Sequence, residues 1–199
     1  MNIESAYRLI FLTDALTLFR AGELLALRWK NFDLKAPTLQ ATHALFSGAS
    51  RWLEGSDTNH LVEGVKTKGS AVPLKIARGL ALMLSEHREQ SRFNSDEDFI
   101  FCRPDGRPYD PNFLRKLVLY PALEAAGIKC RKHTHGFHLF RHSGATMLAE
   151  ITRDPLIVRD MLRHSQLSTT AGYVKPGGMA NGASDLLLEA IFGIRDLIN

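Results

Sequence analysis

Four polar side chains near the C-terminal end of the chain have types and spacings that suit chemistry on a phosphate ester. His138 and Arg141 are three residues apart, so on a helix they share one face and can reach the same small anion. His164 precedes Tyr173 by nine residues, and a turn of the chain could bring both to that point. The set contains a cation, two proton carriers and an oxygen nucleophile, with no carboxylate, and this selection favours a phosphodiester.

The order of these residues resembles the C-terminal signature of the tyrosine recombinases, the phage integrase family. That signature is His-x-x-Arg, then Leu-x-His, then a tyrosine nine residues after this histidine, and the segment from His138 to Tyr173 has the same spacing. The resemblance implies a catalytic domain that breaks and rejoins DNA through a 3′-phosphotyrosyl intermediate, without metal, ATP or any other cofactor. The middle position of Leu162-Arg163-His164 is glycine in most of the family, and this chain has an arginine there.

The resemblance extends to the N-terminal part of the chain. Arg20 is followed three residues later by Glu23 and then by an apolar segment that ends at Trp29. In the resembled family the first catalytic arginine has these neighbours, usually with a glycine two residues before it, where this chain has Leu18. Read without the resemblance, Arg20 and Glu23 would be an ordinary i,i+3 ion pair on a helix.

A lysine completes the set that the family uses. The family carries its catalytic lysine in a β-hairpin, commonly as Lys-Thr before a Val-Pro-Leu strand, and Lys66-Thr67 followed by Val72-Pro73-Leu74 resembles this pattern. The turn is a residue or two shorter than usual, so Lys68 is an alternative general acid. The expected catalytic residues are therefore Arg20, Lys66, His138, Arg141, His164 and Tyr173.

The resemblance implies a role for each residue. Tyr173 attacks the scissile phosphate and expels the 5′-oxygen, which Lys66 protonates. Arg20 and Arg141 hold the non-bridging oxygens, His164 donates a hydrogen bond to the phosphate, and His138 assists proton transfer from Tyr173. Glu23 is expected to orient Arg20 or a neighbouring histidine from behind.

The charge of the chain is concentrated just before and within this motif. Residues 1–102 carry 12 basic and 12 acidic side chains, residues 103–142 carry eight against three, and residues 143–199 carry five against six. A local basic region fits binding to the backbone of double-stranded DNA, although a solvated basic face is an equally good interpretation of charge alone. The expected DNA-binding side chains are Arg115, Lys116, Lys129, Arg131 and Lys132.

Other sites are less well supported by the sequence. His138 and His142 have a zinc-like i,i+4 spacing near Cys130, but no glutamate lies between them, and Arg141 would repel a dication. The sequence contains no phosphate-binding glycine loop and no nucleophile elbow. It also has no apolar run near the ~20 residues that span a membrane and no signal peptide. With only two cysteines, we expect a cytoplasmic protein that is associated with the nucleoid when it binds DNA.

Apolar periodicity predicts several helices and a small three-stranded antiparallel sheet, and the resemblance implies a mainly helical α+β fold with the helices around that sheet. The strands are expected at 38–46, 60–65 and 71–74, with a long first connection and a tight second turn. Asp110-Pro111 and Asp154-Pro155 are signals for helix starts, and Pro121 predicts a kink. Ser184 is expected to cap an amphipathic C-terminal helix.

We expect residues 1–199 to form a single catalytic domain that lacks the family's N-terminal DNA-clamping domain and binds DNA weakly alone. The resemblance implies a homotetramer on DNA, accessory DNA-bending or directionality proteins, and a C-terminal helix over residues 183–198 that packs either in its own chain or on a neighbouring subunit. Two alternatives remain: a type IB topoisomerase that relaxes supercoils, and a DNA-binding remnant that does not cleave. The sequence leaves open the DNA site, the direction of recombination and whether a phage, a mobile island or the host owns the gene.

Overall fold

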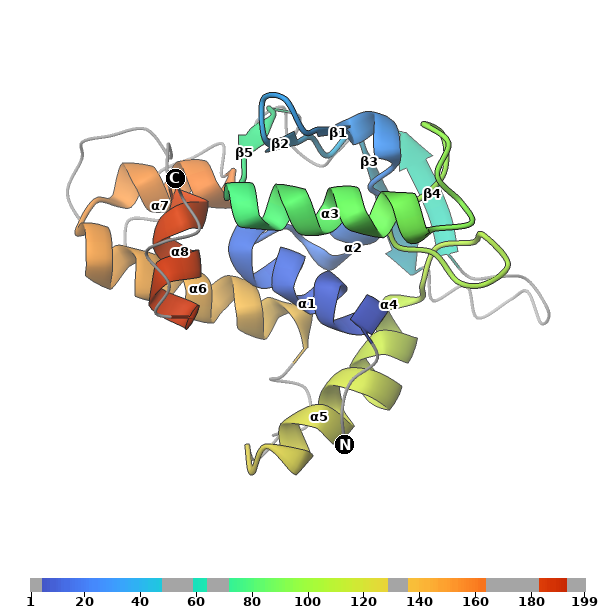
Figure 1. Ribbon diagram of the computed structural model, residues 1–199. Coiled ribbons are helices and arrows are strands. Elements are labelled where there is room, and N and C mark those ends of the chain that lie inside the picture. Colours follow the sequence, from blue (N-terminus) through green and yellow to red (C-terminus); the bar gives the residue numbers. More distant parts are fainter. Residues whose placement is uncertain (1–4, 48–58, 64–71, 129–135, 164–182, 193–199) are drawn as a thin grey trace.

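Helix α1 (Ser5–Thr17) is the element around which the others pack (Figure 1). The computed structural model describes residues 5–47, 59–63, 72–128, 136–163 and 183–192. The apolar face predicted from the spacing of Leu9, Ile10 and Leu16 is buried, and the helix contacts α2, α3, α6 and α8. Because α1 touches four other helices, any residue at its C-terminal end lies near the middle of the molecule.

Helix α2 (Ala21–Leu25) follows α1 after a sharp change of direction. Leu18, the residue directly after α1, has left-handed backbone angles with φ of 52°, and Arg20 is the N-cap residue of α2. The Glu23 carboxylate accepts a hydrogen bond from the Arg20 backbone N–H at 3.1 Å, which is the second half of a capping box. The pairing of Arg20 with Glu23 that the sequence predicts is therefore also what starts this helix.

The strands form a three-stranded antiparallel sheet in the order β1-β2-β5 and a separate antiparallel pair, β3 with β4. The strands are β1 (Phe32–Asp33), β2 (Thr38–Leu39), β3 (His43–Ser47), β4 (Asn59–Glu63) and β5 (Leu74–Lys75). The pair β3-β4 packs beside α2. The three-stranded sheet lies above α3 (Figure 1), so the strands cover one side of the helical core.

The predicted first strand, residues 38–46, is divided between the two sheets. Residues 40–42 belong to neither strand and separate β2 from β3, and two of them bond to Asn31. The Gln40 N–H donates to the Asn31 carbonyl at 2.9 Å, and the Asn31 amide donates to Thr42 Oγ1 at 3.0 Å. The sequence pattern also missed β1, which is only two residues long.

Helix α3 (Arg78–Gln90) follows β5. The next helical segment begins at Asp110, whose carboxylate accepts from the backbone N–H groups of the two residues after Pro111. It consists of α4 (Pro111–Phe113), a π-helical turn η3 (Leu114–Leu119) and α5 (Tyr120–Ala125). Pro121 lacks the N–H that an α-helix needs, and the wide π-helical turn lies just before it, where the sequence predicts a kink.

Three helices complete the core on the C-terminal side: α6 (Phe137–Thr152), α7 (Pro155–Leu162) and α8 (Ala183–Phe192). Asp154 caps α7 as predicted, accepting from the Leu156 N–H at 2.8 Å. Ser184 lies inside α8 instead of capping it, and its hydroxyl accepts from the Ala77 N–H at 3.2 Å. That hydrogen bond ties α8 to the start of α3, and α8 also packs on α1 and α6 of its own chain.

The mainly helical α+β class with a small three-stranded antiparallel sheet is thus confirmed. The connection 48–58 and the hairpin turn that holds Lys66 and Lys68 lie outside the described residues. Among the helices that the structure describes, none is long and apolar enough to cross a lipid bilayer.

Gly22 provides a test of the packing between α2 and β3. A Cβ atom at this position would collide with the Leu45 carbonyl oxygen, a backbone atom that cannot rotate away. Alanine usually stabilises a helix relative to glycine by about 1 kcal/mol. We expect Gly22→Ala instead to lower the free energy of unfolding by about 1–3 kcal/mol, as overpacking does. Urea denaturation followed by circular dichroism measures this, and a more stable variant would contradict the packing.

Candidate active site

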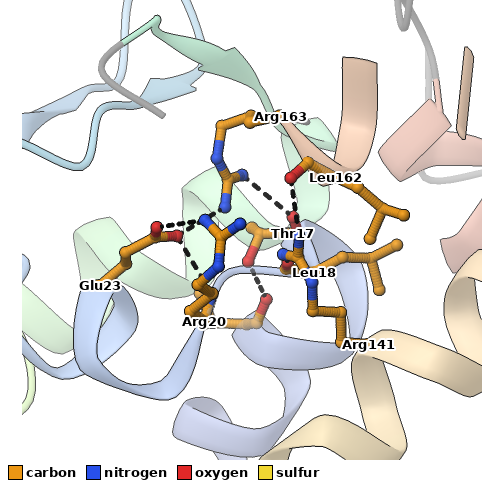
Figure 2. Close-up of polar contacts among 8 residues, drawn as sticks. Thr17, Leu18, Arg20, Glu23, Arg141, Leu162 and Arg163 are labelled. Atoms are coloured by element: carbon orange, nitrogen blue, oxygen red, sulfur yellow. Dashed lines mark hydrogen bonds and ion pairs between the residues drawn. The ribbon is translucent and has the colours of Figure 1, made fainter. Parts of the chain in front are cut away.

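Arg141 joins the ends of two helices that are far apart in the sequence (Figure 2). Its guanidinium donates to the carbonyl oxygen of Leu18, directly after α1, and to that of Leu162, the last residue of α7, the latter at 2.7 Å. Arg141 is 8% exposed. Carbonyl groups at helix C-termini lack intrahelical partners and carry partial negative charge, so these two ends form a buried site for a cation.

Glu23 lies between two guanidinium groups (Figure 2). One carboxylate oxygen accepts from Arg20 Nη1 at 2.8 Å, and the other accepts from Arg163 Nη2 at 2.9 Å. The Glu23 and Arg163 side chains are 2% and 3% exposed, whereas the Arg20 side chain is 29% exposed. Arg20 is thus the member of this trio that can reach a ligand from solvent, while the other two lie behind it.

The three arginines and Glu23 affect one another's ionisation. Burial lowers the pKa of Arg141 to about 9, and the charges of Arg20 and Arg163 act in the same direction. Burial also lowers the pKa of Arg163 to about 10, against the effect of Glu23. Burial acts to raise the pKa of Glu23, but Arg163 and Arg20 outweigh it and hold that pKa below its usual value. Near neutral pH the cluster therefore has three positive charges and one negative charge.

His138 belongs to the same electrostatic environment. Its pKa is lowered by partial burial and by the charges of His142, Arg141 and Arg20. The His138 and His142 rings, one helical turn apart on α6, have centroids 6.4 Å apart. Lowering the pKa of an imidazole favours its neutral form, which can accept a proton. No group of three or more potential metal ligands lies together among the described residues.

Asp14 is a buried carboxyl group beside this cluster that the sequence analysis did not single out. Burial raises its pKa well above the usual value, although the charge of Arg141 acts against this. Neither carboxyl oxygen has a hydrogen-bond partner among the residues that the structure describes. Asp14 lies in the last part of α1. The surrounding positions of this helix are core residues, so the sequence pattern gave no signal that this carboxyl group belongs to a site.

The structure brings together four of the predicted residues: Arg20, Glu23, Arg141 and, through its electrostatic interactions with the two arginines, His138. The others lie outside the described residues, namely Lys66, Lys68, Lys129, Arg131, Lys132, His164 and Tyr173. Of the expected DNA-binding side chains, Lys116 is exposed on η3, and Arg115 donates to Asn112 Oδ1 at 2.9 Å. Their roles remain predictions.

Arg163 is the buried side chain in the site that the sequence analysis noted only as a departure from the family pattern. Its guanidinium carbon lies 3.9 Å from the centroid of the Phe19 ring, and its Nη1 donates to the Thr17 carbonyl at 3.5 Å. An arginine where glycine is expected was the available signal, but sequence alone does not reveal which way such a side chain points.

Comparisons with known proteins identify the family of the chain. The model of the phage integrase family matches residues 2–177. The chain is 29% identical to a tyrosine recombinase XerC-like protein of Caldanaerobacter subterraneus, over 89% of this chain and 48% of that protein. It is 26% identical to the tyrosine recombinase XerH of Helicobacter pylori, over 86% of this chain and 41% of that protein. The chain therefore spans about half the length of these relatives.

Solved structures share the fold at low sequence identity. The Tn1549 transposon integrase in complex with circular intermediate DNA superposes with a TM-score of 0.65 at 15% identity, over 92% of this chain and 58% of that one. The XerH recombinase bound to its difH substrate superposes with a TM-score of 0.56 at 24% identity, over 96% and 49%. The fold of the present chain is that of a tyrosine recombinase catalytic domain. The chain belongs to the phage integrase family.

Replacing Arg141 by lysine tests whether the planar guanidinium is needed to hold the two helix ends. A single ammonium group cannot reproduce the geometry of a guanidinium that donates to both carbonyls, so at least one buried carbonyl loses its partner. We expect Arg141→Lys to reduce the free energy of unfolding by about 1–3 kcal/mol. The exposed Arg153→Lys is the control and should change it by less than about 0.5 kcal/mol. Equal unfolding curves for both variants would contradict the bridging role.

The Asp14 carboxyl group predicts a distinctive pH dependence of stability. Because its pKa is raised on folding, the folded state binds more protons than the unfolded state, and the contribution of Asp14 falls as pH rises above its unfolded value of about 3.9. Asp14→Asn removes this titration. We expect the stability of the variant relative to the wild type to improve between about pH 4 and pH 7, as measured by thermal unfolding. A difference that does not depend on pH would contradict this assignment.

Proposed function

We propose that this chain is the catalytic part of a site-specific DNA recombinase that cuts one strand with Tyr173 and keeps the 3′-phosphate as a phosphotyrosyl ester. The observation that carries the proposal is the cluster of Arg20, Glu23 and Arg141, in a chain of the phage integrase family. One ester replaces another in this reaction, so the bond energy is retained and rejoining needs neither ATP nor metal.

Arg20 and Arg141 are proposed to hold the non-bridging oxygens of the scissile phosphate. Negative charge develops on these oxygens in the transition state, and fixed guanidinium groups in a site with little water stabilise it without reorganising. The net positive charge of the cluster supports this role because it attracts a phosphodiester before the chemistry begins.

Proton transfer is assigned to the remaining residues. Tyrosine has an ordinary pKa of about 10, so Tyr173 must lose a proton as it attacks. His138 is proposed to help remove it, and the lowered pKa of His138 supports this role. Lys66, or Lys68 in its place, is proposed to protonate the leaving 5′-oxygen, and His164 to donate a hydrogen bond to the phosphate.

Double-stranded DNA is the proposed partner, and a homotetramer on DNA is the proposed assembly, with accessory proteins bending the DNA or setting the direction. Ile191 and Phe192 at the end of α8 are 40% and 49% exposed, which supports a contact between this helix and a neighbouring subunit. The protein would act where its DNA lies, in the cytoplasm at the nucleoid. The family match favours recombination over the relaxation of supercoils.

A covalent trap on DNA of randomised sequence tests the proposed chemistry. The substrates are nicked duplexes with a randomised segment next to the nick, so that cleavage releases a short fragment and leaves the enzyme attached to DNA. We expect the wild-type chain to form an adduct that survives denaturing electrophoresis and Tyr173→Phe to form none, because only the phenol oxygen can make the ester.

Arg20→Ala should reduce adduct formation by about 10²–10³-fold, the usual loss when one charge-stabilising donor is removed. Tyr120→Phe, on another helix, is a matched control for Tyr173→Phe and should retain the wild-type rate. If the wild-type chain binds duplexes but forms no adduct, it is a non-cleaving DNA-binding protein, and the proposed activity is wrong.

A further inference from the structure

We propose that Arg163 is a positioning residue for Arg20, acting through the Glu23 carboxylate that their guanidinium groups share. This inference rests on the proposed phosphotyrosine chemistry and adds a third arginine to it. The side chain of Arg163 is 3% exposed, so it acts from behind the residues that face the phosphate. It lies directly before His164 in the chain, so it also ties the end of α7 to the site.

The backbone at residue 163 makes arginine an unfavourable choice there. Arg163 is the C-cap of α7 with φ of 52° and ψ of 39°, the left-handed region in which a Cβ atom is strained and glycine is not. The family pattern that the chain resembles has glycine at this position. Favourable contacts of the arginine side chain would offset part of this strain.

The guanidinium group of Arg163 has three such contacts, all at the junction of α1 and α2, and Figure 2 shows those with Glu23 and Thr17. Nη2 donates to Glu23 at 2.9 Å, Nη1 donates to the Thr17 carbonyl at 3.5 Å, and the guanidinium carbon lies 3.9 Å from the centroid of the Phe19 ring. Each partner lies within three residues of Arg20 in the sequence. Arg163 therefore fixes the segment that carries Arg20 on both sides of it.

The charges explain why such a residue matters for the reaction. Glu23 bonds Arg20 through both the Nη1 group and the backbone N–H, and a lone carboxylate in this place would neutralise the arginine that must attract a phosphate. Arg163 brings the second positive charge to the same carboxylate. Two guanidinium groups and one carboxylate leave one net positive charge, so Glu23 can orient Arg20 without cancelling its attraction for the scissile phosphate.

Replacing Arg163 by glycine separates the positioning of Arg20 from a general contribution to stability. Glycine relieves the backbone strain at this position while it removes the guanidinium group. In the trapping assay with saturating duplex, we expect Arg163→Gly to slow adduct formation by about 10–100-fold, the usual cost of losing a residue that orients a ligand-binding group. Affinity for the same duplex should change by less than about 3-fold, because the exposed phosphate contacts remain.

The matched control is Arg153→Gly. Arg153 is also an arginine at a helix C-cap with φ of 52°, but it is exposed. This variant relieves the same strain and should leave the rate unchanged. If Arg163→Gly does not fold, as judged by circular dichroism, Arg163→Met keeps the length of the side chain and replaces it in the test. A folded Gly or Met variant with the wild-type rate overturns the proposal.

Chemical rescue and a double variant distinguish positioning of Arg20 from a purely structural role of Arg163. A purely structural role would leave both results unchanged. Millimolar guanidinium chloride should restore part of the rate of Arg163→Gly by occupying the space between Phe19 and Glu23, whereas urea at the same concentration should not. In a Glu23→Gln background there is no carboxylate charge to balance, so Arg163→Met should cost much less than in the wild type. Absence of rescue together with additive effects overturns the proposal.

The wild-type chain separates failure of this inference from failure of the proposed function. If the wild type forms no adduct, the proposed function is wrong and the role of Arg163 is overturned with it. If the wild type forms the adduct and the Arg163 variants match its rate, only the positioning role is wrong.

Discussion

The site depends on the hydrogen bonds by which Arg141 holds the ends of α1 and α7 together. Its guanidinium reaches the Leu18 carbonyl, 123 residues away in the sequence, and the Leu162 carbonyl, 21 residues away. Helix C-termini concentrate partial negative charge, so two of them aimed at one point tolerate a buried cation that apolar surroundings would expel. The residue proposed to hold a phosphate is thus also the residue that brings the two helix ends together.

The departure from the family pattern at Leu18 is compatible with this arrangement because of a neighbour on α6. Leu18 adopts φ of 52° where the family usually has glycine, and its side chain is fully buried. A Cβ atom at Gly144 would collide with the Leu18 side chain, so the missing side chain on α6 provides the space for the added one on α1. The Leu18 carbonyl still reaches Arg141 because the left-handed turn itself is kept.

Local patterns in the sequence predicted those features of the structure that depend only on residues close together in the chain, such as helix caps and shared helix faces. Asp110 and Asp154 cap helices because a short acidic side chain before a proline can reach the backbone N–H groups two or three positions later, and His138 and Arg141 share α6 because of their spacing. The division of residues 38–46 between two sheets was not predictable, because β2 pairs with β1 and β5 while β3 pairs with β4, and a local pattern does not select such partners. The carbonyl partners of Arg141 could not be predicted either. Every residue has a carbonyl group, and only the tertiary fold determines which two of them Arg141 reaches.

The charge of the cluster links the stability of the fold to its affinity for an anion. Arg20, Arg141 and Arg163 face a single ionised carboxylate, Glu23, while burial favours the neutral form of Asp14. Burial and mutual repulsion lower the pKa of Arg141 and Arg163, which means that both effects destabilise the folded protein when no anion is bound. A bound phosphodiester would remove part of this repulsion. Each positive charge that destabilises the empty site would therefore strengthen the attraction for the proposed phosphodiester. The apolar contacts of α1 with four other helices contribute stability that offsets this repulsion.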